Sequence, residues 1–451
     1  MVARNGRVGY DGVVATKTLE AMTREGAESA FNAQFKSKTG NKWEDRSNFL
    51  KKDDKYDLIL NSQSPLKVAS YRAESRPKSI SNSKSSLPIP TQELLSMVLD
   101  KDMFKSAMSE LKLDMNALAK LPLGVLNTEQ ISKGLDALKQ IEQILSVPSK
   151  ASKKKGKSSS ANPGDLNKLT DRFYTVIPHA AKMNVKLPVI DNLVLLQEKY
   201  EMLSVLGDIA IGAAIDTSSS IDDKYAELNC KLDILPRSSE EFNVIERYIS
   251  NTMGTGLNNY TLDNVWSLSR NPEDKSFAAF KKVDNHRLLW HGTKVAMVAG
   301  IMKTGLRLMP AFTGSRCGRG IYLANELMKS AGYSGSANNI HGKQTVVLFL
   351  VEAALGKQHV IYKDDSSFVE APPGFDSVLA KSGRSPPESG DATLTLGGTR
   401  VKVSQLPPAP VGSVPHSSFC QDEFLVYKEA QQRLRYAVTF TYGDNEDYGD
   451  Y

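Results

Sequence analysis

The feature that most constrains the fold of this chain is a change in hydrophobic periodicity near residue 230. Between residues 86 and about 225, apolar residues recur three and four positions apart, which gives a helix one apolar face. The clearest stripe consists of Ile131, Leu135, Leu138, Ile141 and Leu145. From about residue 234 onward the apolar runs are short or alternating and are broken by Gly, Pro and Ser, as is typical of strands. The sequence therefore predicts an all-helical domain followed by a β-rich one.

Several runs in the C-terminal half have the length and composition of strands. They are HRLLW, GIYLA, TVVLFLVEAAL, EFLVYK and LRYAVTFTY. Only short helices fit between them, for example over residues 293–304 and 325–332. The tract 363–416 is rich in Pro, Gly and Ser, and we expect it to form hairpins and loops over the sheet.

The N-terminal segment has a third pattern. Residues 1–62 combine the strand-like runs RVGYDGVV and KYDLILN with an amphipathic stretch over 19–37. Residues 63–85 are rich in Ser, Lys and Pro and lack apolar periodicity, which indicates a linker. We therefore predict a multidomain α+β protein, with a small α/β module at 1–62, a linker at 63–85, a helical domain at 86–225 and a β-rich domain at 234–451.

Composition excludes two classes of protein. The chain has 451 residues, of which 40% are hydrophobic and 24% charged, as in globular domains. Its longest apolar stretches, 202–215 and 345–355, are short and carry acidic residues, so we expect no membrane span. Three distant cysteines, Cys230, Cys317 and Cys420, exclude a disulfide framework. We expect no secretory signal and a reducing intracellular compartment.

The excess positive charge is confined to the N-terminal segment. Residues 1–84 contain 16 Lys+Arg and 10 Asp+Glu, whereas the remainder contains 41 of each. Such a local surplus suits a contact with nucleic-acid phosphates, although a solvated surface with a basic linker explains it equally well. The lysine-rich loop 150–164 also has two interpretations: it could be a nuclear-import signal, or it could be a solvated linker.

Four short blocks near the C-terminus carry the candidate chemistry. They are LLWHGT (288–293), GRGIYLAN (318–325), KSAGY (329–333) and DEFLVY (422–427). Each places a polar or aromatic group in or beside an apolar run, namely His291, Tyr322, Ser330 with Tyr333, and Glu423. Taken singly, each has an ordinary explanation as a core histidine, a packed tyrosine or a solvated carboxylate.

Taken together, the four blocks describe a site that could hold and split a dinucleotide. Gly292, at a strand end, lets the backbone approach a ligand closely. Two tyrosine faces and the Ser330 hydroxyl suit a flat ring that bears an amide, such as nicotinamide. The Glu423 carboxylate could bond a ribose hydroxyl and stabilise the oxocarbenium ion that forms when a glycosidic C–N bond breaks.

The same blocks resemble the His-Tyr-Glu signature of the poly(ADP-ribose) polymerase catalytic domain. The similarity continues through LRLMP (306–310), LVEAALGK (350–357), PPGFDSV (372–378) and LRYAVTF. Upstream, LPIPTQELLSMVLD, TDRFYTVIPH and LLQEKYEML resemble the family's helical regulatory domain. NGRVG (5–9), TGNKW (39–43) and KYDLIL (55–60) resemble its WGR module. Several segments are most similar to a nuclear member that mainly transfers single ADP-ribose units.

The resemblance implies a role for each matching residue. Gly292 and Ser330 would hold the nicotinamide carboxamide, with Tyr333 stacked on the ring and Tyr322 on the other side. His291 and Thr293 would bind the adenosine-side ribose, and Arg307 would lie near the adenine. Glu423 would bond the nicotinamide-side ribose. These residues are assigned as follows: catalytic, Glu423, His291 and Tyr322; NAD+-binding, His291, Gly292, Thr293, Arg307, Tyr322, Ser330 and Tyr333.

The activity implied is an NAD+-dependent transfer of ADP-ribose to proteins, the enzyme itself included, with release of nicotinamide. NAD+ is the substrate and no metal is expected. The partners would be acceptor proteins and DNA strand breaks, the compartment the nucleus, and the helical domain an autoinhibitory lid. Two rivals are a DNA-end-binding scaffold with an inactive catalytic fold and a tRNA phosphotransferase on a related fold.

The N-terminal module departs from the family pattern. Asn5 stands where the module has its tryptophan, and the strands that normally precede this motif are missing from the sequence. An indole can stack on a base or sugar at a DNA end, whereas an asparagine cannot. Arg7, which would link the module to the catalytic domain, is retained. We expect either a truncated module or a weakened dependence on DNA.

Overall fold

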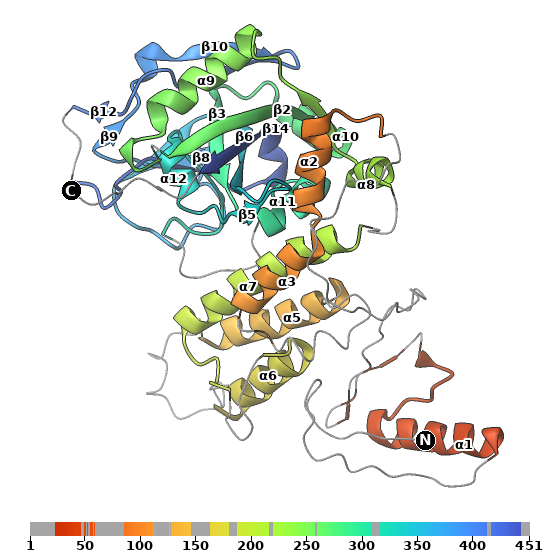
Figure 1. The fold of residues 1–451 in the computed structure, drawn as a ribbon. Helices are drawn as coiled ribbons and strands as arrows, with labels where there is room; N and C mark the ends of the chain where they lie inside the picture. Colours follow the sequence, from red (N-terminus) through yellow and green to blue (C-terminus); the bar gives the residue numbers. More distant parts are fainter. Residues whose placement is uncertain are drawn as a thin grey trace, which may run out of the picture.

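A helical module and a β-rich module follow one another along the chain (Figure 1). The computed structural model describes residues 23–46, 49–50, 52, 55–56, 58, 85–111, 113, 126, 128–145, 163–179, 187–215, 220–257, 259–308, 316–412 and 416–442. This arrangement confirms the predicted multidomain α+β fold and the change of periodicity on which it rests. None of the described helices has the length and apolar content that crossing a bilayer requires.

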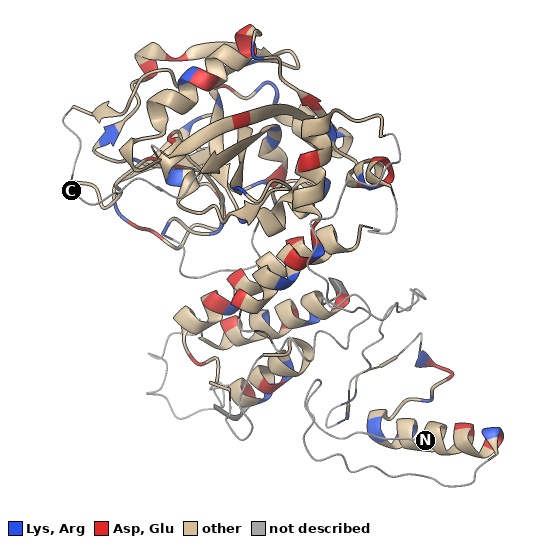
Figure 2. Ribbon diagram, viewed as in Figure 1, with Lys and Arg blue, Asp and Glu red and all other residues tan. Residues whose placement is uncertain are grey.

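Near the N-terminus, the described residues form one helix, α1 (Arg24–Thr39). The hydroxyl of Thr23 accepts a hydrogen bond from the amide of Gly26 at its start, and Gly40, with φ 73°, ends it. Acidic and basic residues both lie along α1 (Figure 2), so this helix does not carry a basic surface. The strand-like run at 7–14 and most of the run at 55–61 lie outside the described residues.

The helical module contains six described helices. They are α2 (Ile89–Val98), α3 (Lys101–Glu110), α5 (Thr128–Leu145), α6 (Pro163–Val176), α7 (Leu193–Ala213) and α8 (Ile221–Leu228). Side chains cap several of them: Asn192 accepts from the amide of Leu195 at the start of α7, and Ser220 forms a capping box with Asp223 in α8.

The helical and β-rich modules share a hydrophobic core. Leu95 and Val98 of α2 are fully buried and pack in the same cluster as Trp266 of the sheet. The Trp266 indole nitrogen donates to the hydroxyl of Thr91, 3.0 Å away, and satisfies the polar group that this packing buries. The helical module is therefore attached to the β-rich module by apolar packing as well as by the chain.

The β-rich module is built on one large sheet. Its strands run in the order β1-β2-β14-β6-β3-β11-β10, with β5 beside β6. They are β1 (Lys231–Ile234), β2 (Tyr260–Ser269), β3 (His286–Gly292), β5 (Ala337–Asn338), β6 (Gln344–Ala354), β10 (Ala392–Leu396), β11 (Thr399–Val403) and β14 (Gln432–Tyr442). Nearly every residue of β6 is buried, because this strand is central and covered on both faces.

A smaller sheet positions the candidate site beside the large one. Its order is β4-β13-β8-β7, and its strands are β4 (Ile321–Leu323), β7 (Gln358–Ile361), β8 (Ser377–Ala380) and β13 (Glu423–Val426). A bridge between Trp290 of β3 and Ala324 joins the two sheets. A further pair, β9 (Arg384–Ser385) and β12 (Ala409–Pro410), lies between β8 and β13 in the chain.

Four helices complete the β-rich module: α9 (Glu240–Thr252), α10 (Asn271–Phe277), α11 (Val295–Thr304) and α12 (Leu327–Ala331). The short helices α11 and α12 agree with those predicted at 293–304 and 325–332. The tract 363–416 does form a hairpin, β10–β11, but this hairpin extends the large sheet by pairing with β3, whereas we expected it to lie over the sheet.

Candidate active site

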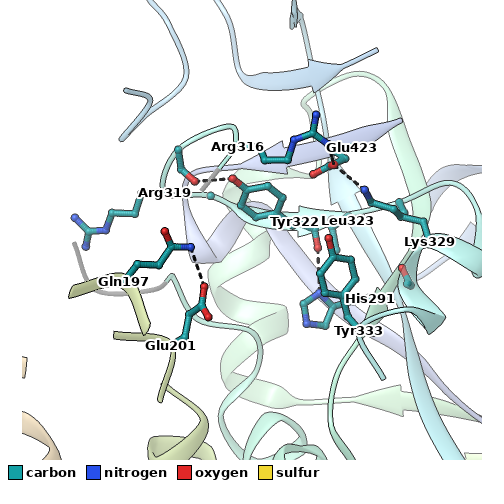
Figure 3. A pocket seen from close by; sticks show the side chains of 15 residues that line it. Gln197, Glu201, His291, Arg316, Arg319, Tyr322, Leu323, Lys329, Tyr333 and Glu423 are labelled. Carbon is teal, nitrogen blue, oxygen red and sulfur yellow. Dashed lines mark hydrogen bonds and ion pairs between the residues drawn. The ribbon is translucent and has the colours of Figure 1, made fainter. Parts of the chain in front are cut away.

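A cavity of about 380 Å³ opens where the two sheets meet. Six residues that we identified from the sequence line this cavity: His291, Gly292, Tyr322, Ser330, Tyr333 and Glu423. They come from β3, from β4 and α12 with the turn after it, and from β13, three parts of the chain that are well separated in sequence. The cavity is also lined by Arg316, Gly318, Arg319, Gly320, Leu323, Ala324, Lys329, Gln197 and Glu201 (Figure 3).

Strand pairing brings the four elements together. β13 lies between β4 and β8, and its register places Leu425 opposite Tyr322 and Glu423 opposite Ala380. The bridge from Trp290 to Ala324 then sets the end of β3 beside the end of β4. Because α12 follows β4 directly, its residues also reach this edge. The ends of three strands and one short helix thus converge on one cavity.

Gly292 is required by packing as well as by any ligand. A β-carbon at this position would stand 1.7 Å from the backbone carbonyl oxygen of Ser330, a distance that no pair of atoms can adopt without bonding. The absence of a side chain lets α12 approach the end of β3. The backbone of Gly292 and the buried hydroxyl of Ser330 consequently lie on the same wall of the cavity.

The His291 imidazole has a fixed tautomer. Its Nδ1 lies 3.0 Å from the carbonyl oxygen of Tyr322, and since a carbonyl only accepts, Nδ1 must carry the proton. Burial lowers the pKa of His291 below its ordinary value, which favours the neutral ring. A neutral ring protonated at Nδ1 keeps Nε2 as a hydrogen-bond acceptor, the form that suits a ligand hydroxyl.

The two tyrosines differ in how they are held. The Tyr322 hydroxyl donates to the carbonyl of Gly318, 2.8 Å away, and accepts from the amide of Cys317, 3.0 Å away. Its ring is therefore fixed on the cavity wall. Tyr333 is 65% exposed, and the Lys329 ammonium lies 6.0 Å from the centre of its ring. The Tyr333 ring thus lines the cavity while most of its surface is open to solvent.

The Glu423 carboxylate is buried beside two cations that sequence reasoning did not assign. The ammonium of Lys329 lies 2.7 Å from its Oε1, and Nη1 of Arg316 lies 3.7 Å from the same oxygen. Residue Glu423 is only 4% exposed. The two cations flank this carboxylate where it lines the cavity (Figure 3) and offset the electrostatic cost of burying it.

Arg316 is anchored on its other side. Its Nε and Nη2 donate to the two oxygens of Asp364 at 3.0 and 2.9 Å, and Nη2 also donates to the carbonyl of Ser418. The guanidinium stacks on Phe419, with 4.5 Å between its central carbon and the ring centre. These contacts raise the pKa of Arg316, chiefly through the hydrogen bonds to Asp364, and fix Nη1 toward Glu423.

Two of the residues predicted to bind NAD+ do not line this cavity. Thr293 is buried, and its hydroxyl lies 3.5 Å from the sulfur of Met297. Arg307 forms an ion pair with Asp208 of the helical module. Neither lines the cavity. Arg7 lies outside the described residues, so its role stays a prediction.

One wall of the cavity comes from the helical module. Gln197 and Glu201 of α7 line it, and the amide of Gln197 donates to the carboxylate of Glu201, 3.0 Å away. α7 is held there by close backbone packing on α11, since a β-carbon on Gly300 would lie 2.5 Å from the carbonyl oxygen of Asp208. Gln197 and Glu201 are polar residues on a predicted helix, a pattern typical of a solvent-exposed face. The pattern therefore did not indicate that these two residues line the cavity.

The arrangement suits a substrate with a flat amide-bearing ring and a ribose. The Gly292 backbone and the Ser330 hydroxyl can bond an amide, and the exposed Tyr333 ring can stack on its ring. The Glu423 carboxylate and the His291 imidazole, whose Nε2 is a hydrogen-bond acceptor, line the same cavity. Such a carboxylate can stabilise positive charge that develops on a sugar when its glycosidic bond breaks.

Comparison with known proteins gives matches over most of the chain. The family model of the poly(ADP-ribose) polymerase catalytic domain matches residues 239–442, that of the poly(ADP-ribose) polymerase regulatory domain matches 85–230, and that of the WGR domain matches 1–50.

Individual proteins are similar over nearly the same extent. Protein mono-ADP-ribosyltransferase PARP3 of Mus musculus is 38% identical over 96% of this chain and 81% of the relative. The protein of the same name from Gallus gallus is 36% identical over 94% and 78%. Poly [ADP-ribose] polymerase 1 of Xenopus laevis is 32% identical over 96% of this chain and 42% of its own length.

Proposed function

The chain belongs to the poly(ADP-ribose) polymerase family, and we propose that its cavity between β3, β4, α12 and β13 is the site where NAD+ is split and ADP-ribose is transferred to protein side chains. The chain is thus an NAD+-dependent ADP-ribosyltransferase. The observation that carries the assignment of the site is the convergence of His291, Tyr322 and Glu423 on one cavity.

The nicotinamide end of NAD+ would bind at the wall formed by β3 and α12. The backbone of Gly292 and the hydroxyl of Ser330 would bond the carboxamide, and Tyr333 and Tyr322 would enclose the ring. The Nε2 of His291 would accept a hydrogen bond from a hydroxyl of the adenosine-side ribose. These contacts would leave the nicotinamide-side ribose next to Glu423.

Transfer then requires the bond between ribose C1′ and the nicotinamide nitrogen to break. The electron pair of that bond returns to the ring and neutralises its positive charge, while the ribose gains oxocarbenium character. The Glu423 carboxylate accepts a hydrogen bond from the 2′-hydroxyl and stabilises this cation. An acceptor oxygen bonds to C1′ and its proton is released. Because Lys329 and Arg316 both engage Oε1 of Glu423, we assign the hydroxyl to Oε2.

We also propose that the helical module acts as a lid on this cavity. In support, α7 contributes Gln197 and Glu201 to the cavity wall and its Asp208 pairs with Arg307, the residue expected near the adenine. Binding of a DNA break at the N-terminal module would favour a state in which α7 moves away. The match of residues 1–50 to the WGR domain and the similarity to poly(ADP-ribose) polymerase relatives support a role in the response to DNA damage and a nuclear location.

Incubation of the full chain with NAD+ labelled in the adenine ring tests the function. The proposal requires nicotinamide release together with label that stays on protein in denaturing gels, and the signal should increase with nicked DNA. A ladder would indicate chain elongation and a single band single-unit transfer. Binding to nicked DNA with no label and no nicotinamide would favour the rival, a DNA-end-binding scaffold.

A further inference from the structure

The carboxylate of Asp422, next to Glu423 in the chain, is 1% exposed and is surrounded by hydrogen-bond donors. Its Oδ2 accepts from the ammonium of Lys381 at 2.7 Å and from the hydroxyl of Ser385 at 2.6 Å. Its Oδ1 accepts from the backbone amide of Ser382 at 2.8 Å. Because donors engage both of its oxygens, this carboxylate is held in one orientation.

These contacts tie the start of β13 to the segment after β8. In the register of the two strands Glu423 lies opposite Ala380, so Asp422 continues the antiparallel pair and faces Lys381. Ser382 and Ser385 are both buried, and the chain turns around the carboxylate between them. The position of β13 at Glu423 is therefore set by Asp422 as well as by the strand ladder.

The same network reaches the helix on the other side of the cavity. The hydroxyl of Ser385, which donates to Asp422, accepts from the side-chain amide of Asn325 at 3.1 Å. Asn325 is 2% exposed and lies in the turn between β4 and α12. A second link runs parallel to the first, since the amide of Gln421 donates to the carboxylate of Glu326 at 3.1 Å.

We propose that Asp422 is the positioning residue that sets the spacing between Glu423 on β13 and the residues of α12, Lys329 and Ser330. This inference rests on the proposed function, because it assigns nicotinamide to the α12 wall and the ribose to Glu423. A small error in that spacing would leave each wall intact but misplace the carboxylate relative to the ribose. Displacement of a catalytic group by about 1 Å can reduce turnover roughly a hundredfold.

The test compares Asp422→Asn with the wild type in the transfer assay with labelled NAD+. The variant should lose at least about tenfold in kcat while its KM for NAD+ and its affinity for free nicotinamide change less than about threefold. Ser385→Ala removes the link to Asn325 but keeps the ion pair of Asp422 with Lys381, and it should reproduce part of the kcat loss. It keeps the proposal testable if Asp422→Asn does not fold.

A matched control is Asp391→Asn. The Asp391 side chain is only 5% exposed and pairs with Arg287 at 2.8 Å, but it lies beside β10 at the outer edge of the large sheet. This variant should lower the melting temperature with kcat unchanged. Wild-type kcat in folded Asp422→Asn or Ser385→Ala would overturn the inference, and so would equal kcat losses in Asp422→Asn and Asp391→Asn. An inactive wild type would instead overturn the proposed function.

Discussion

The backbone carbonyl oxygen of Ser330 occupies the space that a β-carbon on Gly292 would need, at 1.7 Å. Any side chain at 292 must therefore push α12 away from the end of β3. Since both residues lie on the wall assigned to nicotinamide, this close approach connects a packing requirement to substrate binding.

Gly292→Ala should accordingly weaken NAD+ binding at least about tenfold and destabilise the β-rich module by about 1–3 kcal/mol, the usual range for overpacking. Titration with nicotinamide and thermal unfolding measure the two effects. Gly412→Ala is the control, because a β-carbon there meets open space, and it should resemble the wild type. Unchanged nicotinamide affinity in Gly292→Ala would exclude this wall as the carboxamide site.

Lys329→Met removes the ammonium that lies 2.7 Å from Glu423 Oε1 while keeping much of the side-chain volume. We expect kcat to fall by about tenfold or more, because a buried carboxylate that loses its partner is left poorly compensated and free to turn away. Steady-state kinetics with NAD+ measure this. Lys231→Met, which removes an exposed ion pair with Asp233, should leave kcat unchanged. Equal kcat in both variants would mean that the ion pair does not support catalysis.

The double variant Gln197→Ala and Glu201→Ala tests the lid without removing it. Shortening both side chains opens one wall of the cavity, so the KM for NAD+ in the absence of DNA should fall by severalfold. Glu198→Ala, on the exposed face of the same helix, is the control. A double variant with the wild-type KM and the wild-type response to DNA would show that α7 does not restrict the site.

Deletion of residues 86–225 is the coarser form of that experiment. It should raise activity without DNA and remove the response to DNA. The truncated protein will expose Trp266, which packs against α2, so its folding must be checked by its unfolding transition. A truncated protein that folds but shows no increase in activity without DNA would contradict the proposal that the helical module is a lid.

The burial of His179 predicts how the stability of the helical module depends on pH. It is buried against Phe173 and Tyr174, and burial lowers its pKa from 6.5 to about 4. At pH values between 4 and 6.5, His179 binds a proton in the unfolded chain but not in the folded module. The contribution of neutral His179 to the free energy of unfolding is therefore fully present above pH 6.5 and is lost as the pH falls toward 4. The loss should amount to about 3 kcal/mol.

Unfolding by denaturant between pH 4.5 and 7 measures this dependence. His179→Leu should flatten the pH dependence of the helical module, whereas His341→Gln, at a histidine whose side chain is 61% exposed, should retain the wild-type slope. A wild-type slope in His179→Leu would assign the acid sensitivity to other groups.

Much of the fold follows from hydrophobic patterns within short segments of the sequence. The continuous apolar run of β6 predicts a strand buried on both faces, and the helical stripe of α5 predicts an amphipathic helix. The missed helix α9 also had a signal: Ser239 caps it, and Phe242, Ile245 and Ile249 form its buried face. The strands and helices predicted for the β-rich domain begin at residue 286 and therefore omit α9.

Other features depend on contacts between distant segments. The alternation of Leu394 and Leu396 predicts a strand, but nothing local to that hairpin specifies β3 as the neighbour of β11. In the site, the order of the four blocks identified the residues that the structure brings together. The ion pair of Lys329 with Glu423 and the contribution of Gln197 depend on where two helices pack, which periodicity does not encode.

The central claim is that Glu423 supports the breaking of the bond between ribose and nicotinamide. The most direct measurement is the single-turnover rate of nicotinamide release from NAD+ by the wild type and by Glu423→Gln, with nicotinamide affinity measured on both. We predict that the variant binds nicotinamide as the wild type does but releases it from NAD+ at least about a hundredfold more slowly. A variant that releases nicotinamide at the wild-type rate would contradict the account.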